Sequence, residues 1–152
     1  MKKINFILTI IAILTFFTAC NSSDDSSSKT LKKEVKICPE CNMPVEKSNI
    51  FKASLLTNGT TEYFDDIGCM ILWCHEKNLN MKEAKVFCKD TKRYIDAKDA
   101  YFKIGEKTPM LYGFAAYEKK IDGSTSFEVV TIKMLRGENM RNPRIRKQIL
   151  GH

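Results

Sequence analysis

The sequence predicts a small α+β domain, made of two ββαβ-like hairpin-plus-helix units behind a signal segment and a flexible tether. Three observations lead to this prediction: an Asn-Gly pair between two alternating apolar segments, an amphipathic stretch directly after an Asp-Asp pair, and short apolar segments further along the chain. The chain has 152 residues, 43% of them hydrophobic, and a formal net charge of +7. This composition suits one compact domain with accessory segments and excludes a collagen-like or wholly disordered chain.

Residues 1–19 have the pattern of a signal peptide. Lys2 and Lys3 precede an apolar run that is too short for an ordinary membrane-spanning helix. The run ends in Phe-Thr-Ala-Cys, which resembles the lipobox of bacterial lipoproteins. The resemblance implies lipidation of Cys20 and, because Asn21 follows it, anchoring to the outer membrane with the body facing the periplasm. The alternative is an uncleaved membrane anchor in which Cys20 is an ordinary thiol.

Residues 20–36 comprise the lipidated Cys and a tether rich in Ser, Asp and Lys, which we expect to stay flexible. The folded domain is expected over residues 37–132. Residues 133–152 form a basic tail with six basic residues and one acidic residue, a net charge of +5. The tail is either a solvated, partly helical end or an electrostatic contact with an anionic membrane or an acidic partner. Nucleic acid is not an expected partner for an exported chain.

The first hairpin-plus-helix unit is expected directly after the tether. Apolar residues alternate over 51–55, and Asn58-Gly59 then precedes a second strand over 60–64, because Asn-Gly is the strongest short hairpin signal. Asp65-Asp66 offers an N-cap for the next helix, and we prefer that role to acid–base catalysis. Apolar positions with helical spacing predict a helix over 67–77: Ile67, Met70, Ile71 and Cys74.

The second unit is expected from about residue 84 onward. The segments that it contains are strands over 85–89, 93–95 and 127–132 and a short helix over 97–103. The segment 110–117, with Gly113 in its middle, has an ambiguous pattern.

Sulfur chemistry dominates the candidate functional residues. Setting Cys20 aside leaves an odd number of thiols, so at least one is free or bound in an oxidising compartment: Cys38, Cys41, Cys69, Cys74 and Cys88. A zinc knuckle would need a second ligand pair, and a thioredoxin-like motif should open a helix after a strand. A third interpretation adds Met43, which in an extended stretch shares a face with Cys41. Thiolate and thioether are soft ligands that select Cu(I).

Two further positions offer soft ligands. Cys69 and Met70 stand together at the start of the predicted helix, where core packing is the alternative role for Met70. Met110 stands in a loop, where an isolated apolar residue is less easily explained by core packing.

Four segments follow one another behind the lipobox: CPECNMPV, FDDIGCMILW, KVFCKDTKRYIDAKDAYF and TPMLYGFAAY. Together they resemble the NosL family, periplasmic copper-binding lipoproteins encoded with nitrous oxide reductase, over residues 37–127. The resemblance implies a pair of ββαβ-like units, one bound Cu(I) and a copper chaperone for the reductase's copper–sulfur centre, and hence a role in denitrification. It maps the family's Cys and Met to Cys41 and Met43 and its later Pro-Met to Pro109-Met110. Asn42 replaces the family's Gly but tolerates the same left-handed backbone.

The expected metal ligands are therefore all sulfur: Cys41, Met43, Met110, Cys38, Met70 and Cys69. Cys41 would be the thiolate anchor, and Met43 and Met110 would be weak, exchangeable thioethers. We expect no enzyme, and as partners nitrous oxide reductase or its assembly apparatus and a membrane. Two alternatives stay open. One is a thiol–disulfide redox protein using Cys38 and Cys41; the other is a metal-free binding module with disulfide pairs such as Cys38–Cys41 and Cys74–Cys88.

Overall fold

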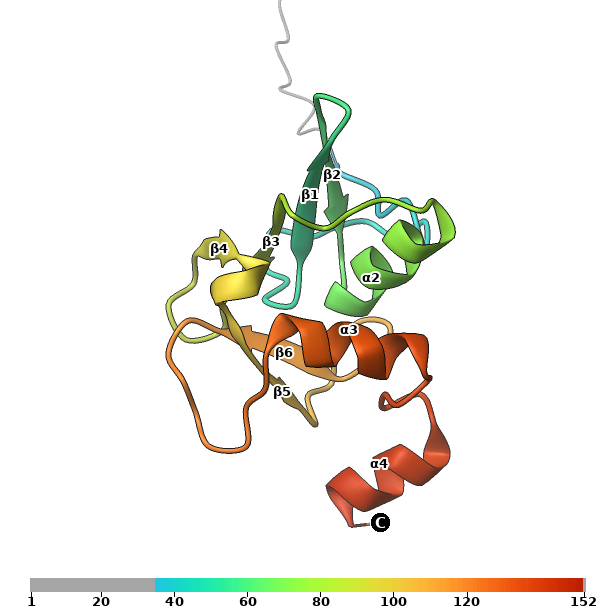
Figure 1. The fold of residues 1–152 in the computed structure, drawn as a ribbon, viewed down its shortest axis with the longest axis vertical. Coiled ribbons are helices and arrows are strands. Elements are labelled where there is room, and N and C mark those ends of the chain that lie inside the picture. The colour runs from blue at the N-terminus through green and yellow to red at the C-terminus, as the bar shows by residue number, and fades with distance from the viewer. Residues whose placement is uncertain (1–34, 152) are drawn as a thin grey trace, which may run out of the picture. The chain divides into compact units, whose positions relative to one another are not determined.

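The structure is a computed structural model that describes residues 35–151 (Figure 1). The expected signal peptide, the lipidation of Cys20 and most of the tether lie outside the described residues. Within residues 35–151, two antiparallel sheets and three α-helices confirm the α+β class. Over residues 35–151, no helix has both the length and the apolar character needed to cross a membrane.

The first sheet is built on the predicted hairpin. Strands β1 (Ala53–Thr57) and β2 (Thr60–Phe64) pair in antiparallel register, with Thr57 opposite Thr60. Asn58 and Gly59 both have positive φ, 49° and 75°, as a two-residue hairpin turn of this twist requires. Strands β3 (Ala84–Phe87) and β4 (Tyr94–Asp96), which the sequence places in the second unit, instead extend this first sheet to the order β2-β1-β3-β4, because β3 pairs with β1.

Helix α2 (Ile67–Glu76) follows β2 directly, as predicted. The side chain of Asp66 caps it by accepting a hydrogen bond from the backbone N–H of Gly68 at 2.9 Å. The helix packs against β1 and β2, and the four apolar positions that predicted it are all buried. At Gly68 an added Cβ would lie 2.3 Å from the ring of Tyr112, so the absence of a side chain lets the Tyr112 loop reach the first turn.

The second unit differs in part from the prediction. The helix expected over 97–103 is only one 3₁₀ turn, η2 (Ala97–Asp99), followed by strand β5 (Tyr101–Ile104). This strand pairs with β6 (Phe114–Tyr117), which resolves the ambiguous segment around Gly113 as a loop and then a strand. The unit is therefore again a hairpin followed by a helix.

The strand expected over 127–132 is wrong, because this segment begins helix α3 (Phe127–Leu135). The β-branched run there favours a strand locally, but the buried residues Phe127, Val130 and Met134 recur with helical spacing. Packing of this face against α2 and β5 decides the outcome. A last helix, α4 (Pro143–Leu150), lies in the basic tail.

One hydrophobic core joins both units. Its largest fully buried apolar side chains come from both sheets and from α2 and α3: Phe64, Phe102, Phe114, Leu55, Ile67, Met70, Ile71, Val86 and Val130. Cys38 and Cys69 are also fully buried in this core. The packing of α2 on the first sheet therefore places sulfur atoms next to the segment that precedes the hairpin.

Candidate metal centre

A closed turn carries the first two cysteines. The backbone N–H of Cys38 donates to the carbonyl of Met43 at 2.8 Å, and the N–H of Asn42 donates to the carbonyl of Cys38 at 2.9 Å. Asn42 has φ 60°, the left-handed conformation that Asn tolerates better than most residues. The stretch from Cys41 to Met43 is therefore not extended, and strand alternation does not place these two side chains on one face.

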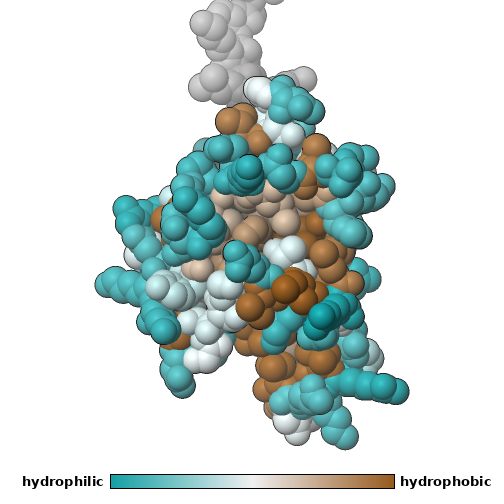
Figure 2. Space-filling view, in the orientation of Figure 1, coloured by the Kyte–Doolittle hydropathy of each residue, from teal (hydrophilic) through white to brown (hydrophobic). Residues whose placement is uncertain are grey.

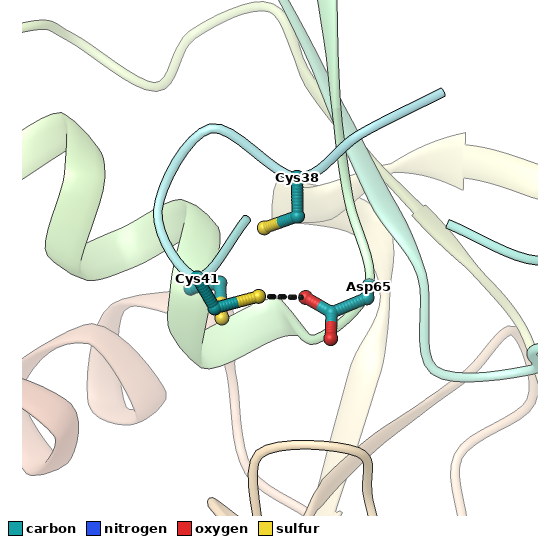
Figure 3. Close-up of side chains that lie close together, drawn as sticks. Cys38, Cys41 and Asp65 are labelled. Carbon is teal, nitrogen blue, oxygen red and sulfur yellow. Dashed lines mark hydrogen bonds between the residues drawn. The ribbon is translucent and has the colours of Figure 1, made fainter. Parts of the chain in front are cut away.

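Cys38, Cys41, Asp65 and Cys69 form a cluster, whose four ligand atoms all lie within 4.8 Å of one another. The turn supplies two thiols, the residue after β2 supplies the carboxylate, and the first turn of α2 supplies the third thiol. Figure 3 shows the Cys38 and Cys41 side chains converging with that of Asp65. Three of the four residues are buried and Cys41 is half-buried. This donor set could hold a metal ion.

The carboxylate of Asp65 is incompletely paired. Its Oδ1 accepts a hydrogen bond from the Cys41 thiol at 3.1 Å, while its Oδ2 is buried without any hydrogen-bond partner. A buried acceptor without a partner is costly, and such groups in native proteins often mark a missing ion or water. The oxygen that faces the thiols is Oδ1 (Figure 3), so a cation held between the thiols would take the place of the Cys41 proton at Oδ1. The residues present therefore fit a metal ion.

The three thiols of the cluster differ in acidity. Hydrogen bonding from the Cys69 thiol lowers the pKa of Cys38 to about 7. The same contact, together with burial, raises the pKa of Cys69. Loss of solvation raises the pKa of Cys41 to about 12, helped by its contacts with Asp65 and Cys38. At neutral pH the cluster thus holds protons that an incoming metal ion must displace.

Asp66 fulfils the predicted capping role and adds a tertiary one. Its Oδ2 accepts hydrogen bonds from the Thr108 hydroxyl at 2.5 Å and from the backbone N–H of Met110 at 3.2 Å. Burial raises the pKa of Asp66 to about 6. Asp66 therefore fastens the loop before β6 to the start of α2, beside the cluster.

Asp65 is the cluster residue that sequence reasoning does not find, because a helix N-cap accounts for the Asp65-Asp66 pair. One carboxylate is enough for an N-cap. The second carboxylate, that of Asp65, is not needed for the cap. It lies two residues after half-buried Tyr63 and four before Cys69, and this position is the signal for a role in the cluster. A carboxylate that follows a strand and precedes a Cys-containing first turn is close enough in sequence to share a site with that Cys.

The structure brings together three of the six sulfur candidates, Cys38, Cys41 and Cys69. Met70 is fully buried in the core, as its alternative role requires. Met110 is half-buried against the core, and Met43 is 41% exposed. Met43 lines a surface pocket of about 510 Å³ together with Asp65 and residues of the loop before β6. This pocket connects the carboxylate side of the cluster with the molecular surface.

All five cysteines of the described region are free, so neither the Cys38–Cys41 nor the Cys74–Cys88 disulfide is present. Cys74 and Cys88 are buried outside the cluster, and burial raises the pKa of each thiol to about 11. They are therefore structural thiols with little thiolate character at neutral pH.

No protein-family model, curated protein or solved structure matches this chain.

Proposed function

We propose that this protein is a periplasmic Cu(I)-binding lipoprotein of the NosL type, a copper chaperone that supplies Cu(I) for the copper–sulfur centre of nitrous oxide reductase. One observation carries the proposal: two segments that resemble NosL proteins supply all four cluster residues. CPECNMPV contributes Cys38 and Cys41, and FDDIGCMILW contributes Asp65 and Cys69. Motifs that are far apart in the chain meet at one point of the fold.

The donor set suits Cu(I). Soft thiolates select this ion, which accepts two or three ligands without a demanding geometry. With metal–sulfur bonds of about 2.3 Å, three sulfurs around one ion lie roughly 4 Å apart. The ligand atoms of the cluster lie within 4.8 Å of one another, so the sulfur atoms need to approach only slightly to reach that spacing.

The position of the site suits a chaperone that must also release its cargo. Cys41 is half-buried and Met43 is exposed, so the turn offers an approach to the cluster from solvent. A ligand from a recipient protein can then add to an incompletely filled coordination shell, and the ion passes by ligand exchange. The chaperone itself catalyses no reaction in this proposal.

A second candidate is a structural zinc site, and the carboxylate of Asp65 favours it. Three thiolates and one carboxylate make a closed, four-coordinate set of the kind that Zn²⁺ adopts. In that case the ion would contribute to folding and would not be handed on.

The test is an anaerobic titration of the fully reduced chain with Cu(I) against a competing chelator, with Zn²⁺ titrated in parallel. We expect one tight Cu(I) equivalent, lost in Cys41→Ser and weakened in Met43→Leu, because the Met43 thioether lies in the same turn and lines the pocket beside Asp65. Met81→Leu is the matched control, because Met81 packs against the core away from any motif. Absence of tight Cu(I) binding by the reduced protein would refute the proposal, and tight Zn²⁺ binding alone would establish the second candidate.

Met43→Leu also separates copper binding from thiol–disulfide exchange, since the thioether has no part in a redox cycle of Cys38 and Cys41.

Copper transfer is then measured by mixing the loaded protein with copper-depleted nitrous oxide reductase and following the copper content of each. The lipid anchor is tested by cell fractionation of the Cys20→Ala variant. We expect processed protein of this variant to be absent from the membrane fraction.

A further inference from the structure

Helix α3 is apolar on both of its sides. Its inner face buries Phe127, Val130 and Met134 in the core. Its outer face exposes three large apolar side chains, with exposed fractions between 38% and 48%: Val129, Ile132 and Leu135. A helix of a soluble protein normally turns charged or polar residues to water, so this outer face is unusual for a surface in contact with water alone.

Helix α4 shows a related feature. It is well capped, since the Asn142 side chain accepts from the N–H of Arg144 at 3.0 Å and Gly151 is left-handed with φ 78°. It nevertheless has no buried residue, and Ile149 and Leu150 are exposed by 43% and 40%. Helices of this length are marginal in water without tertiary packing. Figure 2 shows hydrophobic surface over α3 and α4, bordered by hydrophilic atoms.

The charge around these apolar residues is strongly positive. Residues 127–151 include two acidic residues, Glu128 and Glu138, and six basic ones: Lys133, Arg136, Arg141, Arg144, Arg146 and Lys147. Among the residues that the structure describes, no carboxylate forms a salt bridge with any of these six. Exposed apolar side chains among unneutralised cations are typical of helices that lie in the interface of an anionic membrane.

We propose that α3 and α4 form a peripheral membrane-binding surface that docks onto anionic lipid headgroups. Either a second copy of the chain or a lipid surface would cover the apolar face, and the charge of the two helices favours the lipid surface. A second copy of the chain would bring two sets of six cations together, and like charges at an interface oppose association. An anionic lipid surface neutralises the cations and accepts the apolar side chains between its headgroups. This inference is independent of copper binding.

The test uses the full chain reconstituted in vesicles of phosphatidylcholine, or of phosphatidylcholine mixed with phosphatidylglycerol. Amide hydrogen exchange is measured over α3 and α4. We expect exchange in α4 to slow roughly tenfold in the anionic vesicles only, and this protection to fall with added salt. The triple variant Arg144→Gln, Arg146→Gln, Lys147→Gln should lose the protection. The matched control replaces three exposed lysines outside both helices, Lys77, Lys82 and Lys120, by Gln and should keep it.

A second variant, Ile132→Ser with Leu135→Ser, tests the apolar part and should weaken protection without removing the charge. Equal exchange in the two kinds of vesicle would overturn the proposal. So would salt-insensitive protection that accompanies a dimer in sedimentation, which would assign the face to a second copy. Protection by soluble polyglutamate with none by anionic vesicles would assign it to an acidic protein instead.

Discussion

The thiol of Cys41 donates a hydrogen bond to Oδ1 of Asp65 at 3.1 Å, although 24 residues separate the two in the chain. This contact ties the Cys-x-x-Cys turn to the end of the hairpin. Because the other carboxylate oxygen is buried without a partner, the pair has spare capacity for a cation. The thiol proton of Cys41 forms this hydrogen bond to Asp65, and a metal ion that binds both residues must displace that proton.

Replacing Asp65 by Asn should weaken metal binding without unfolding the protein. Removal of the negative charge leaves an acceptor for the Cys41 thiol but no anionic ligand, so we expect a loss of about 10–100-fold in metal affinity, the size seen when groups that support a metal site are changed. Competition titration with a chelator measures the change. Asp66→Asn is the matched control, since Asn is also a good N-cap and this residue lies outside the cluster. Unchanged affinity in Asp65→Asn would exclude the carboxylate as a ligand.

Two cysteines on the same helix offer a matched pair. Cys69 and Cys74 are both fully buried in α2, but only Cys69 belongs to the cluster. Each Cys→Ser change places a hydroxyl in an apolar environment, and we expect each to lower the free energy of unfolding by about 1–3 kcal/mol. Denaturant titration checks this effect on stability. Only Cys69→Ser should also lose tight metal binding, and similar metal binding in both variants would remove Cys69 from the site.

The left-handed residue in the Cys-x-x-Cys turn should tolerate Gly but not Ala. Asn42 has φ 60°, where a residue with a Cβ other than Asn or Asp is strained by about 1–2 kcal/mol. Asn42→Ala should therefore lower the midpoint of chemical denaturation and weaken metal binding, because the turn sets the positions of Cys38 and Cys41. Asn42→Gly should leave both nearly unchanged. An Ala variant as stable as the wild type would show that the turn adopts another conformation.

Stability should fall in acid partly because of Glu106. Its Oε1 accepts hydrogen bonds from Lys89 at 2.5 Å and from the Tyr117 hydroxyl at 3.1 Å, and the contact with Lys89 lowers the pKa of Glu106 below that of an ordinary glutamate. A lowered folded-state pKa stabilises the protein above the unfolded-state pKa, and this stabilisation is lost as the pH falls through the folded-state value. Glu106→Gln should cost about 0.5–1 kcal/mol at pH 7.

The same variant should cost little at a pH below the folded-state pKa of Glu106, where the wild-type carboxyl is itself protonated. Denaturation curves at both pH values measure the difference. A cost that does not change with pH would show that packing of the side chain, and not its charge, makes the contribution.

The sequence alone determined those features that depend on neighbouring residues. Asn58-Gly59 specified the hairpin because both turn positions need positive φ, and helical spacing with Asp66 as N-cap specified α2. The spacing of Cys38 and Cys41 likewise identified a sulfur pair, but the extended stretch expected from Cys41 to Met43 is a closed turn.

Only the tertiary structure decided the rest of the site and the nature of α3. The β-branched run over 127–132 favours a strand by local preference, and burial of one helical face in the core overrides it. Asp65 joins the cluster because α2 packs on the first sheet and brings Cys69 beneath the turn that carries Cys38. Such convergence depends on contacts between distant segments, and local backbone preferences and residue spacing do not specify these contacts.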